Sequence, residues 1–431
     1  MEQKYRIECN RCGLEIIEDR NQVFCPRCLR EGLLTSVYAN PLTVDPNFTN
    51  IFRYKDWLPV CSEFKGLSSL PGCFQSRNLA RALGLDNLWI LFSGFWPEKG
   101  AFLESTSFKE LEAVGVLSRI FERTRQIPVI SSAGNTGLST LFVSQRLGIP
   151  AIVVAPESAC QEYRVPEKTG PDQTLLISLR DADYRDCIEF TARLERELPG
   201  IVPGGGVYNI ARRDFLGISL LHAAFTMKGI PDHYFQAVGS GTGAIAAREA
   251  NLRLNRFQVF PPKTMRLHLA QNRPYTPIVN LWENRPLDDQ EQAGQVLAQV
   301  LTNPAPPYGV TGGIRDVLSE TQGQVYGVSN TEIQEAKSEF EHLEGMDIQY
   351  PAAAALAALK QAVDRGEIRT KDTILLHITG GGRERLNREE KSMIRPPALS
   401  IDKTRIQKAI SEISAFSAGL GNRFHERKRY A

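Results

Sequence analysis

An apolar strand runs directly into a glycine-rich turn in the sequence YFQAVGSGTG, residues 234–243. The turn consists of Gly239, Ser240, Gly241, Thr242 and Gly243. It has neither the lysine that ends a P-loop nor the third-glycine spacing of a dinucleotide-binding turn. Glycines let a ligand approach the backbone closely, and the N–H groups at the start of the following helix attract anions. The pattern therefore predicts a cradle for one phosphate group, with a plain tight turn as the alternative.

Short apolar strands and amphipathic helices alternate on both sides of this turn. We expect strands at residues 88–92, 128–131, 149–154, 174–179, 234–238, 265–270, 324–329 and 373–379. Helices are expected at 107–125 and 184–198, because apolar residues recur there with the period of a helix. A last amphipathic helix is expected around Ile406, Ile410, Ile413 and Phe416, followed by a basic tail with Arg423, Arg427, Lys428 and Arg429. Apolar strands separated by helices predict an α/β fold whose parallel sheets are covered on both faces.

The charge of the chain is nearly balanced, with 51 Lys and Arg against 49 Asp and Glu in 431 residues and a formal net charge of +2. This balance disfavours a nucleic acid or an anionic membrane surface as the partner. The first residues are charged, and no apolar run approaches the roughly 18 residues that a membrane span needs. We therefore expect a cytoplasmic protein with no nucleic-acid partner and no membrane partner.

Four of the eight cysteines form two C-x-x-C pairs, Cys9 with Cys12 and Cys25 with Cys28. Two such knuckles facing each other make a tetrahedral four-thiolate site for Zn²⁺. Four thiolates leave no open coordination position, so the metal would be structural and would fold a small N-terminal ribbon. The alternative is two coincidental pairs of reduced thiols. Ordinary thiols are expected at the other four positions, Cys61, Cys73, Cys160 and Cys187.

A second glycine-containing turn, SSAGNTG at residues 131–137, also joins a strand to a helix. Upstream of both turns lies Lys109, in the first turn of an expected helix, where a positive charge opposes the helix dipole. A buried lysine can form a Schiff base with a cofactor, although an ordinary surface lysine is the alternative. Thr379 ends the last strand, and its hydroxyl could bond to a pyridine nitrogen. The order of lysine, SAGNTG turn and phosphate turn indicates pyridoxal phosphate.

The sequence resembles the threonine-synthase-like branch of fold-type II pyridoxal-phosphate enzymes and, within it, the cysteate synthases. The stretches that carry this resemblance are FWPEKGAF (95–102), SFKELEA (107–113), SAGNTG (132–137), NxARR (209–213), PDHYFQAVGSGTG (231–243) and NxAPPYxVTGG (303–313). Together the resemblance covers roughly residues 1–385. Threonine synthases proper usually have an acid and then an arginine after the lysine. Here Glu110 is followed by Leu111, which disfavours a threonine synthase.

The resemblance implies a role for each of the motif residues. Lys109 would bind the cofactor covalently, and the turn from Gly239 to Gly243 would bind its phosphate. Asn135 would lie beside the phenolic oxygen of the cofactor, and Thr379 beside its pyridine nitrogen. The substrate carboxylate would bind at the helix start formed by Ser132, Ala133, Gly134 and Thr136. The cations expected for anionic substrates are Lys99, Arg212 and Arg213, with a surface ion pair as the alternative for each.

The reaction implied by the resemblance is a β-replacement on O-phospho-L-serine with sulfite, which gives L-cysteate and phosphate through an aminoacrylate intermediate. Lys109 would remove the Cα proton and later return it. The partners would be these small anions, and the enzyme would be a homodimer. Three alternatives stay open: the same chemistry with another nucleophile, a threonine synthase acting on O-phosphohomoserine, and a non-enzymatic zinc-ribbon interaction protein.

Length allows about three domains. We expect a two-lobed fold-type II enzyme with a zinc ribbon at 1–40, a large cofactor-binding lobe at 41–92 and 220–400, and a small lobe at 93–219. The C-terminal helix and basic tail would occupy 401–431.

Overall fold

The computed structural model describes residues 4–17, 20–64, 67–166, 173–287, 290–390, 392–403, 407 and 410–416. The chain divides into two compact units. Unit 1 comprises residues 1–59, 68–112 and 207–389, and unit 2 comprises 60–67, 113–206 and 390–431. These boundaries differ from the expected ones. Residues 93–112 and 207–219 belong to unit 1, and residues 390–431 belong to unit 2 because a C-terminal strand completes its sheet.

The N-terminal part of unit 1 is a three-stranded antiparallel sheet with the order β2-β1-β3. Its strands are β1 (Tyr5–Cys9), β2 (Glu15–Ile16) and β3 (Leu34–Tyr38). Burial alternates along β1 and β3, so one face of each strand packs inward. On that face, Ser36 and Tyr38 donate hydrogen bonds to one carboxylate oxygen of Asp214, at 2.6 and 2.8 Å. The small sheet is therefore joined to helix α6 (Ile210–Met227), which carries Asp214.

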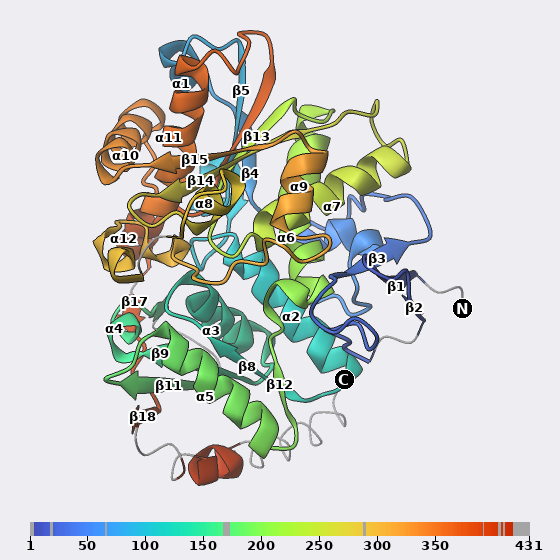
Figure 1. Ribbon diagram of the computed structural model, residues 1–431, viewed down its shortest axis with the longest axis vertical. Helices are drawn as coiled ribbons and strands as arrows, with labels where there is room; N and C mark the ends of the chain where they lie inside the picture. The colour runs from blue at the N-terminus through green and yellow to red at the C-terminus, as the bar shows by residue number, and fades with distance from the viewer. Residues whose placement is uncertain are drawn as a thin grey trace. The chain divides into compact units, whose positions relative to one another are not determined.

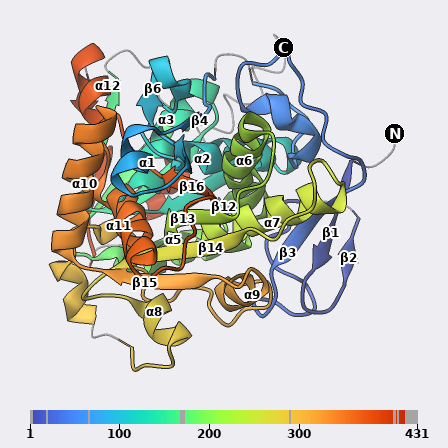
Figure 2. The same cartoon turned by 90° about the horizontal axis from the view of Figure 1, so that it is seen from above.

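The main sheet of unit 1 has six strands in the order β15-β14-β13-β16-β5-β4, and all neighbours are parallel except β4 and β5. Its strands are β4 (Gly72–Gln75), β5 (Asn87–Phe92), β13 (His233–Ala237), β14 (Arg266–Asn272), β15 (Gln324–Val328) and β16 (Thr373–Ile378). Figures 1 and 2 show α10 (Asn330–Glu344) and α11 (Tyr350–Asp364) on one side of this sheet, with α6 and α7 (Thr242–Arg256) on the other. The run of buried alanines in α11, residues 352–355, lets that helix approach the strands closely.

The remaining elements of unit 1 are short. The helices are α1 (Asn78–Ala82), α8 (Pro277–Trp282), α9 (Ile314–Glu320) and α12 (Arg383–Glu389). The 3-10 helices are η1 (Ile51–Trp57), η2 (Pro97–Lys99), η3 (Gly206–Tyr208), η4 (Gln290–Gln295) and η5 (Gln299–Leu301), and β6 (Phe95–Trp96) pairs with β7 (Ala101–Phe102). Helix α2 (Lys109–Arg123) begins in unit 1 and continues in unit 2.

Unit 2 is built on a five-stranded parallel sheet with the order β12-β8-β9-β11-β18. Its strands are β8 (Ile127–Ser131), β9 (Ala151–Pro156), β11 (Thr174–Arg180), β12 (Ile201–Pro203) and β18 (Leu399–Asp402). The other elements are α3 (Asn135–Leu147), α4 (Glu157–Cys160), α5 (Tyr184–Glu197) and the antiparallel pair β10 (Arg164–Pro166) and β17 (Ser392–Ile394).

Alternate residues of the unit 2 strands pack against different helices. Ile152 and Val154 of β9 belong to a core with α5, whereas Val153 belongs to a core with α3. The helix expected near the C-terminus covers the α5 face, because Ile410 and Ile413 are buried in the same core. Ile406 of that expected helix and the basic tail with Arg423, Arg427, Lys428 and Arg429 lie outside the described residues.

The expected α/β fold with parallel sheets is confirmed, and each expected strand agrees with the observed one within two residues at either end. Among the described residues, we find no helix that combines the length and the apolar character needed to cross a membrane.

The end of β16 is clamped against the segment that precedes α2. Phe108 donates its backbone N–H to the carbonyl of Thr379 at 3.0 Å, and Gly381 donates to the carbonyl of Thr106 at 3.1 Å. Ser107 and Gly380 form the β-bridge between these two contacts. The glycines after Thr379 fit this strand end against its other neighbours, because a Cβ at Gly380 would lie 2.9 Å from the side chain of Gln349 and one at Gly382 would lie 2.1 Å from the carbonyl oxygen of Phe95.

Replacement of Gly381 by alanine should destabilise unit 1. A Cβ at this position would lie 2.5 Å from the carbonyl oxygen of Asp347 and 2.7 Å from the ring of Phe92, and neither can move without disturbing the core. We expect Gly381→Ala to lower the free energy of unfolding by about 1–3 kcal/mol, measured by urea titration. Gly229→Ala is the matched control, because its Cβ would meet no described atom within 4 Å. Equal stability of the two variants would contradict the close packing of residue 381 against Asp347 and Phe92.

Candidate functional site

The segment before α2 is held in place by a buried carboxylate, Glu110. Its Oε2 accepts the backbone N–H of Ser105 at 2.6 Å, and its Oε1 accepts the hydroxyl of Ser69 at 2.5 Å. Burial raises the pKa of Glu110 from 4.5 to about 7, although these hydrogen bonds favour the charged form. Together with the contacts to residues 379–381, Glu110 fixes the backbone on the N-terminal side of Lys109.

Lys109 itself is the first residue of α2, and its amine contacts a second buried acid. Its Nζ lies 2.9 Å from Oε2 of Glu112, one helical turn later, and 4.9 Å from the ring centre of Phe108. The other oxygen of Glu112 accepts a hydrogen bond from Nη1 of Arg212 at 2.5 Å. The Lys109 side chain is 19% exposed, and that of Glu112 is 1% exposed. The amine of a partly exposed lysine side chain therefore lies beside a carboxylate that an arginine also binds.

The predicted phosphate turn lies next to this lysine segment. Gly241 has a φ of 77°, which a glycine adopts without strain, and α7 begins at the next residue. The hydroxyls of Ser240 and Thr242 lie 2.9 Å apart. A Cβ on Gly243 would lie 3.0 Å from the ring of Phe108, so the turn and the residue before Lys109 are neighbours. The structure thus brings together the turn, the lysine segment and the strand end with Thr379, which is buried.

A buried chain of polar side chains supports the turn, and the sequence analysis did not identify it. The hydroxyl of Tyr234 donates to Oε1 of Gln236 at 2.9 Å and lies 2.6 Å from Nδ1 of His377. The Nε2 of His377 lies 2.8 Å from the hydroxyl of Ser93. Burial lowers the pKa of His377 to about 3, so this ring is neutral. The chain orients the amide of Gln236, whose Nε2 would lie 2.3 Å from a Cβ on Gly243.

The second turn, at residues 131–137, belongs to unit 2 and starts α3. The hydroxyl oxygen of Ser132 accepts the backbone N–H groups of Gly137 at 2.8 Å and Gly134 at 3.2 Å. Tyr163 donates its hydroxyl to the carbonyl of Ser132 at 2.7 Å. Ala133 is exposed, and Gly134, Asn135 and Thr136 are half-buried. The turn is therefore a rigid, partly exposed start of a helix.

The three expected cations have different surroundings. Arg212 contacts Glu112, as described above. Lys99 is exposed on η2, with its Nζ 4.4 Å from the ring centre of Phe74.

Arg213 does not fit the expectation that it binds the substrate. Its side chain is fully buried, pairs with Glu249 at 3.1 Å, and donates to the backbone carbonyls of Val207 and Leu34. All three of its guanidinium nitrogens are bound inside unit 1, so a substrate could reach Arg213 only by displacing these partners.

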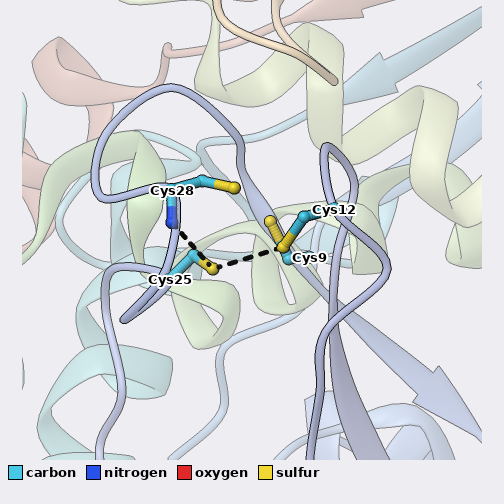
Figure 3. A group of neighbouring side chains, drawn as sticks. All are labelled: Cys9, Cys12, Cys25 and Cys28. Atoms are coloured by element: carbon cyan, nitrogen blue, oxygen red, sulfur yellow. Dashed lines mark hydrogen bonds between the residues drawn. The ribbon is translucent and has the colours of Figure 1, made fainter.

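The four paired cysteines come together at the tip of the N-terminal sheet. Figure 3 shows Cys9, at the end of β1, and Cys12, in the turn that follows, facing Cys25 and Cys28 on another loop. Their four sulfur atoms all lie within 4.8 Å of one another, and those of Cys12 and Cys25 are 3.8 Å apart. Two backbone N–H groups, from Arg27 and Cys28, point at the sulfur of Cys25. Such an arrangement could hold one metal ion.

Known proteins are similar in sequence to this chain over nearly its whole length. The family model described as "Pyridoxal-phosphate dependent enzyme" matches residues 73–380. The cysteate synthase of Methanoregula boonei is 44% identical over 408 residues, which cover 93% of this chain and 95% of the relative. The chain belongs to the cysteate synthase family. The cysteate synthase of Methanosarcina barkeri is 39% identical over 93% of this chain and 99% of its own length.

Solved structures agree with the fold. A pyridoxal 5'-phosphate-dependent aspartate racemase has a TM-score of 0.55 and 15% identity, over 73% of this chain and 90% of its own. Maize serine racemase has a TM-score of 0.54 and 15% identity, over 74% of this chain and 91% of its own. At this identity the likeness shows the fold alone. The protein is thus a fold-type II pyridoxal-phosphate-dependent enzyme, and the non-enzymatic alternative is not supported.

The site residues fit pyridoxal phosphate, the cofactor of this family. The amine of the partly exposed Lys109 side chain could bind a carbonyl carbon, and the glycine turn with two hydroxyls at the start of α7 could bind a phosphate. Among the described residues, the buried hydroxyl of Ser107, two positions before Lys109, has no hydrogen-bond partner. A polar group bound at this point would satisfy it.

The raised pKa of Glu110 gives a testable pH dependence of stability. Between pH 4.5 and about 7 the folded protein holds a proton on Glu110 that the unfolded chain has lost. Stability should therefore fall as the pH rises through this window, by roughly 3 kcal/mol from this residue. In Glu110→Gln the amide can donate to Ser69 and accept from Ser105 at every pH. We expect urea titrations at pH 5 and pH 8 to show a smaller pH dependence for the variant than for the wild type. An equal pH dependence in the two proteins would contradict the raised pKa.

Proposed function

We propose that this enzyme converts O-phospho-L-serine and sulfite to L-cysteate and phosphate by β-replacement. The observation that carries the proposal is the 44% identity, over 93% of this chain, to a relative named cysteate synthase. The lysine, the phosphate turn and the strand end meet within unit 1, as this chemistry requires. In the reaction, the bond between Cβ and the phosphate oxygen breaks and phosphate leaves with the electron pair. The sulfur lone pair of sulfite then forms the new bond to Cβ.

Pyridoxal phosphate, when bound, supplies an electron sink that stabilises negative charge at Cα of the amino acid. The residues of this chain supply the rest. Lys109 takes the Cα proton and returns it after the nucleophile has added. The turn from Gly239 to Gly243 would hold the cofactor phosphate through backbone N–H groups and the hydroxyls of Ser240 and Thr242. The hydroxyl of Thr379 carries no charge, so beside the pyridine nitrogen it would favour elimination over transamination.

The substrates are anions, and two features of the chain suit them. The guanidinium of Arg212 lies near Lys109 through their common partner Glu112, and it is our candidate for binding the phosphate or sulfite group. In unit 2, the start of α3 offers N–H groups for a carboxylate, and we assign the substrate carboxylate to Ser132, Ala133, Gly134 and Thr136, with Asn135 beside the cofactor oxygen. Lys99, which is exposed beside Phe74, is a second candidate cation for these anions.

The product of the reaction tests the proposal directly. Purified enzyme supplied with pyridoxal phosphate, O-phospho-L-serine and sulfite should form L-cysteate, identified by its mass. Lys109→Ala should form none and should lack the visible absorbance of the bound cofactor, because it removes the covalent anchor and the base.

Each alternative has its own outcome in this assay. Absence of cysteate from the wild type would overturn the proposal. A different adduct, formed when sulfide, an amine or a carbon acid replaces sulfite, would identify another nucleophile. Threonine formed from O-phosphohomoserine alone would identify a threonine synthase.

We also propose that Cys9, Cys12, Cys25 and Cys28 bind one structural Zn²⁺. The four sulfur atoms lie within 4.8 Å of one another, and two C-x-x-C knuckles are a common zinc ligand set. Four thiolates occupy every tetrahedral position, so the metal has no place for substrate and would act by folding the N-terminal sheet.

Metal analysis tests the zinc proposal. The purified protein should contain about one zinc ion per chain, and Cys28→Ser should lose most of it, because three thiolates bind the ion less tightly than four. Cys61→Ser is the matched control, since Cys61 is an exposed thiol outside the cluster, and it should retain the metal. Zinc content that is near zero in the wild type, or equal in the two variants, would contradict a four-cysteine site.

A further inference from the structure

Glu112 is a buried acid with two basic partners. One carboxylate oxygen lies 2.9 Å from the amine of Lys109, and the other accepts from Arg212 at 2.5 Å. We propose that Glu112 is a positioning residue that holds the Lys109 amine and the Arg212 guanidinium on separate oxygens, and so governs how readily that amine reacts when it is free. This inference rests on the proposed function of Lys109 as the cofactor-binding lysine and base.

Burial makes the three charges depend on one another. The side chains of Glu112, Arg212 and Lys109 are 1%, 9% and 19% exposed, so solvent screens their interaction only weakly. A carboxylate as buried as Glu112 is costly unless it is paired and hydrogen-bonded. Arg212 is permanently charged and supplies that pairing. Arg212 therefore already balances the negative charge of Glu112 before Lys109 contacts it. The attraction of Glu112 for the lysine ammonium is consequently moderate rather than strong.

A moderate attraction suits the two tasks of Lys109. To remove the Cα proton the amine must be neutral, which an uncompensated carboxylate at 2.9 Å would oppose. To return this proton, the amine of Lys109 must keep it while phosphate leaves and the nucleophile enters. During that time a carboxylate partner holds the ammonium in place. The proton moves from Cα to Nζ and back, so no other donor or acceptor is needed.

The positions of these residues in the chain support a dedicated arrangement. Glu112 follows Lys109 by three residues, so both side chains lie on the same face of α2. Arg212 comes from the first turn of α6, about a hundred residues later in the chain, and its neighbours Arg213 and Asp214 form separate ion pairs with Glu249 and Arg253. Glu112 is thus the shared partner of Lys109 and Arg212.

Acylation of Lys109 tests the inference without any substrate. The full-length protein is freed of cofactor with hydroxylamine and treated at pH 8 with acetyl N-hydroxysuccinimide, which forms an amide with neutral amines only. Peptide mass spectrometry then gives the rate at Lys109. Glu112→Gln should raise this rate roughly five- to tenfold, because the amine is then released from its ion pair with the carboxylate. Arg212→Gln should lower it, because the carboxylate is then uncompensated.

The two substitutions are expected to change the labelling rate of Lys109 in opposite directions, which distinguishes positioning from a general loosening of the site. If either substitution merely exposed Lys109, both would raise the rate, and that result would overturn the inference, as would unchanged rates in both. Lys337, which pairs with Glu341 in the same unit, serves as the reference in each digest. Lys360 forms another ion pair of this unit, with its amine 2.5 Å from the carboxylate of Glu339. The control Glu339→Gln should leave the Lys109 rate unchanged, and a raised rate there would also count against the inference.

The labelling result is independent of the product of the enzyme. Failure to form cysteate would overturn the proposed substrates and leave the role of Glu112 intact. Equal labelling rates in wild type, Glu112→Gln and Arg212→Gln would overturn the role of Glu112 and leave the product assay intact.

Discussion

The site of this enzyme depends on one backbone contact, the clamp between residues 106–108 and residues 379–381. Two hydrogen bonds and a β-bridge join the end of the central strand β16 to the segment before α2. The glycines that end the strand pack so closely against Asp347, Phe92 and Phe95 that a side chain would not fit there. The clamp fixes where α2 begins and therefore where the amine of Lys109 lies relative to Thr379 and the glycine turn. The acid Glu110 secures the same segment from the other side.

Three consecutive charged residues near the start of α6 form three separate buried ion pairs. Arg212 pairs with Glu112 beside the lysine, Arg213 pairs with Glu249 of α7, and Asp214 pairs with Arg253 and accepts hydrogen bonds from strand β3. Successive residues of a helix point in different directions, so one short segment can serve three sites. The N-terminal sheet and the lysine environment are consequently attached to adjacent residues of the same helix, although their sequences lie far apart.

The sequence allowed the fold to be predicted well, because apolar strands and amphipathic helices have distinct periods and the glycine turns mark where strands end. It did not reveal short edge strands such as β4 and β18, whose few residues carry no clear period. The roles of Arg212 and Arg213 also could not be separated, because only tertiary packing decides which of two adjacent arginines is enclosed. Glu112 could have been found from its spacing of three residues from Lys109. The chain from Gln236 to Ser93 could not, since its members are scattered over several strands.

The order of strands in the main sheet has a consequence for synthesis of the protein. Strand β5 pairs with β16, and the side chains of Asn87 and Thr373, 286 residues apart, are hydrogen-bonded. At the usual rates of translation, roughly a quarter of a minute to a minute passes between the synthesis of β5 and that of its partner β16. The sheet of unit 2 waits for β18 in the same way. Both sheets therefore stay incomplete until β16 and β18 have been made, and strands that lack their partners are prone to aggregate during that time.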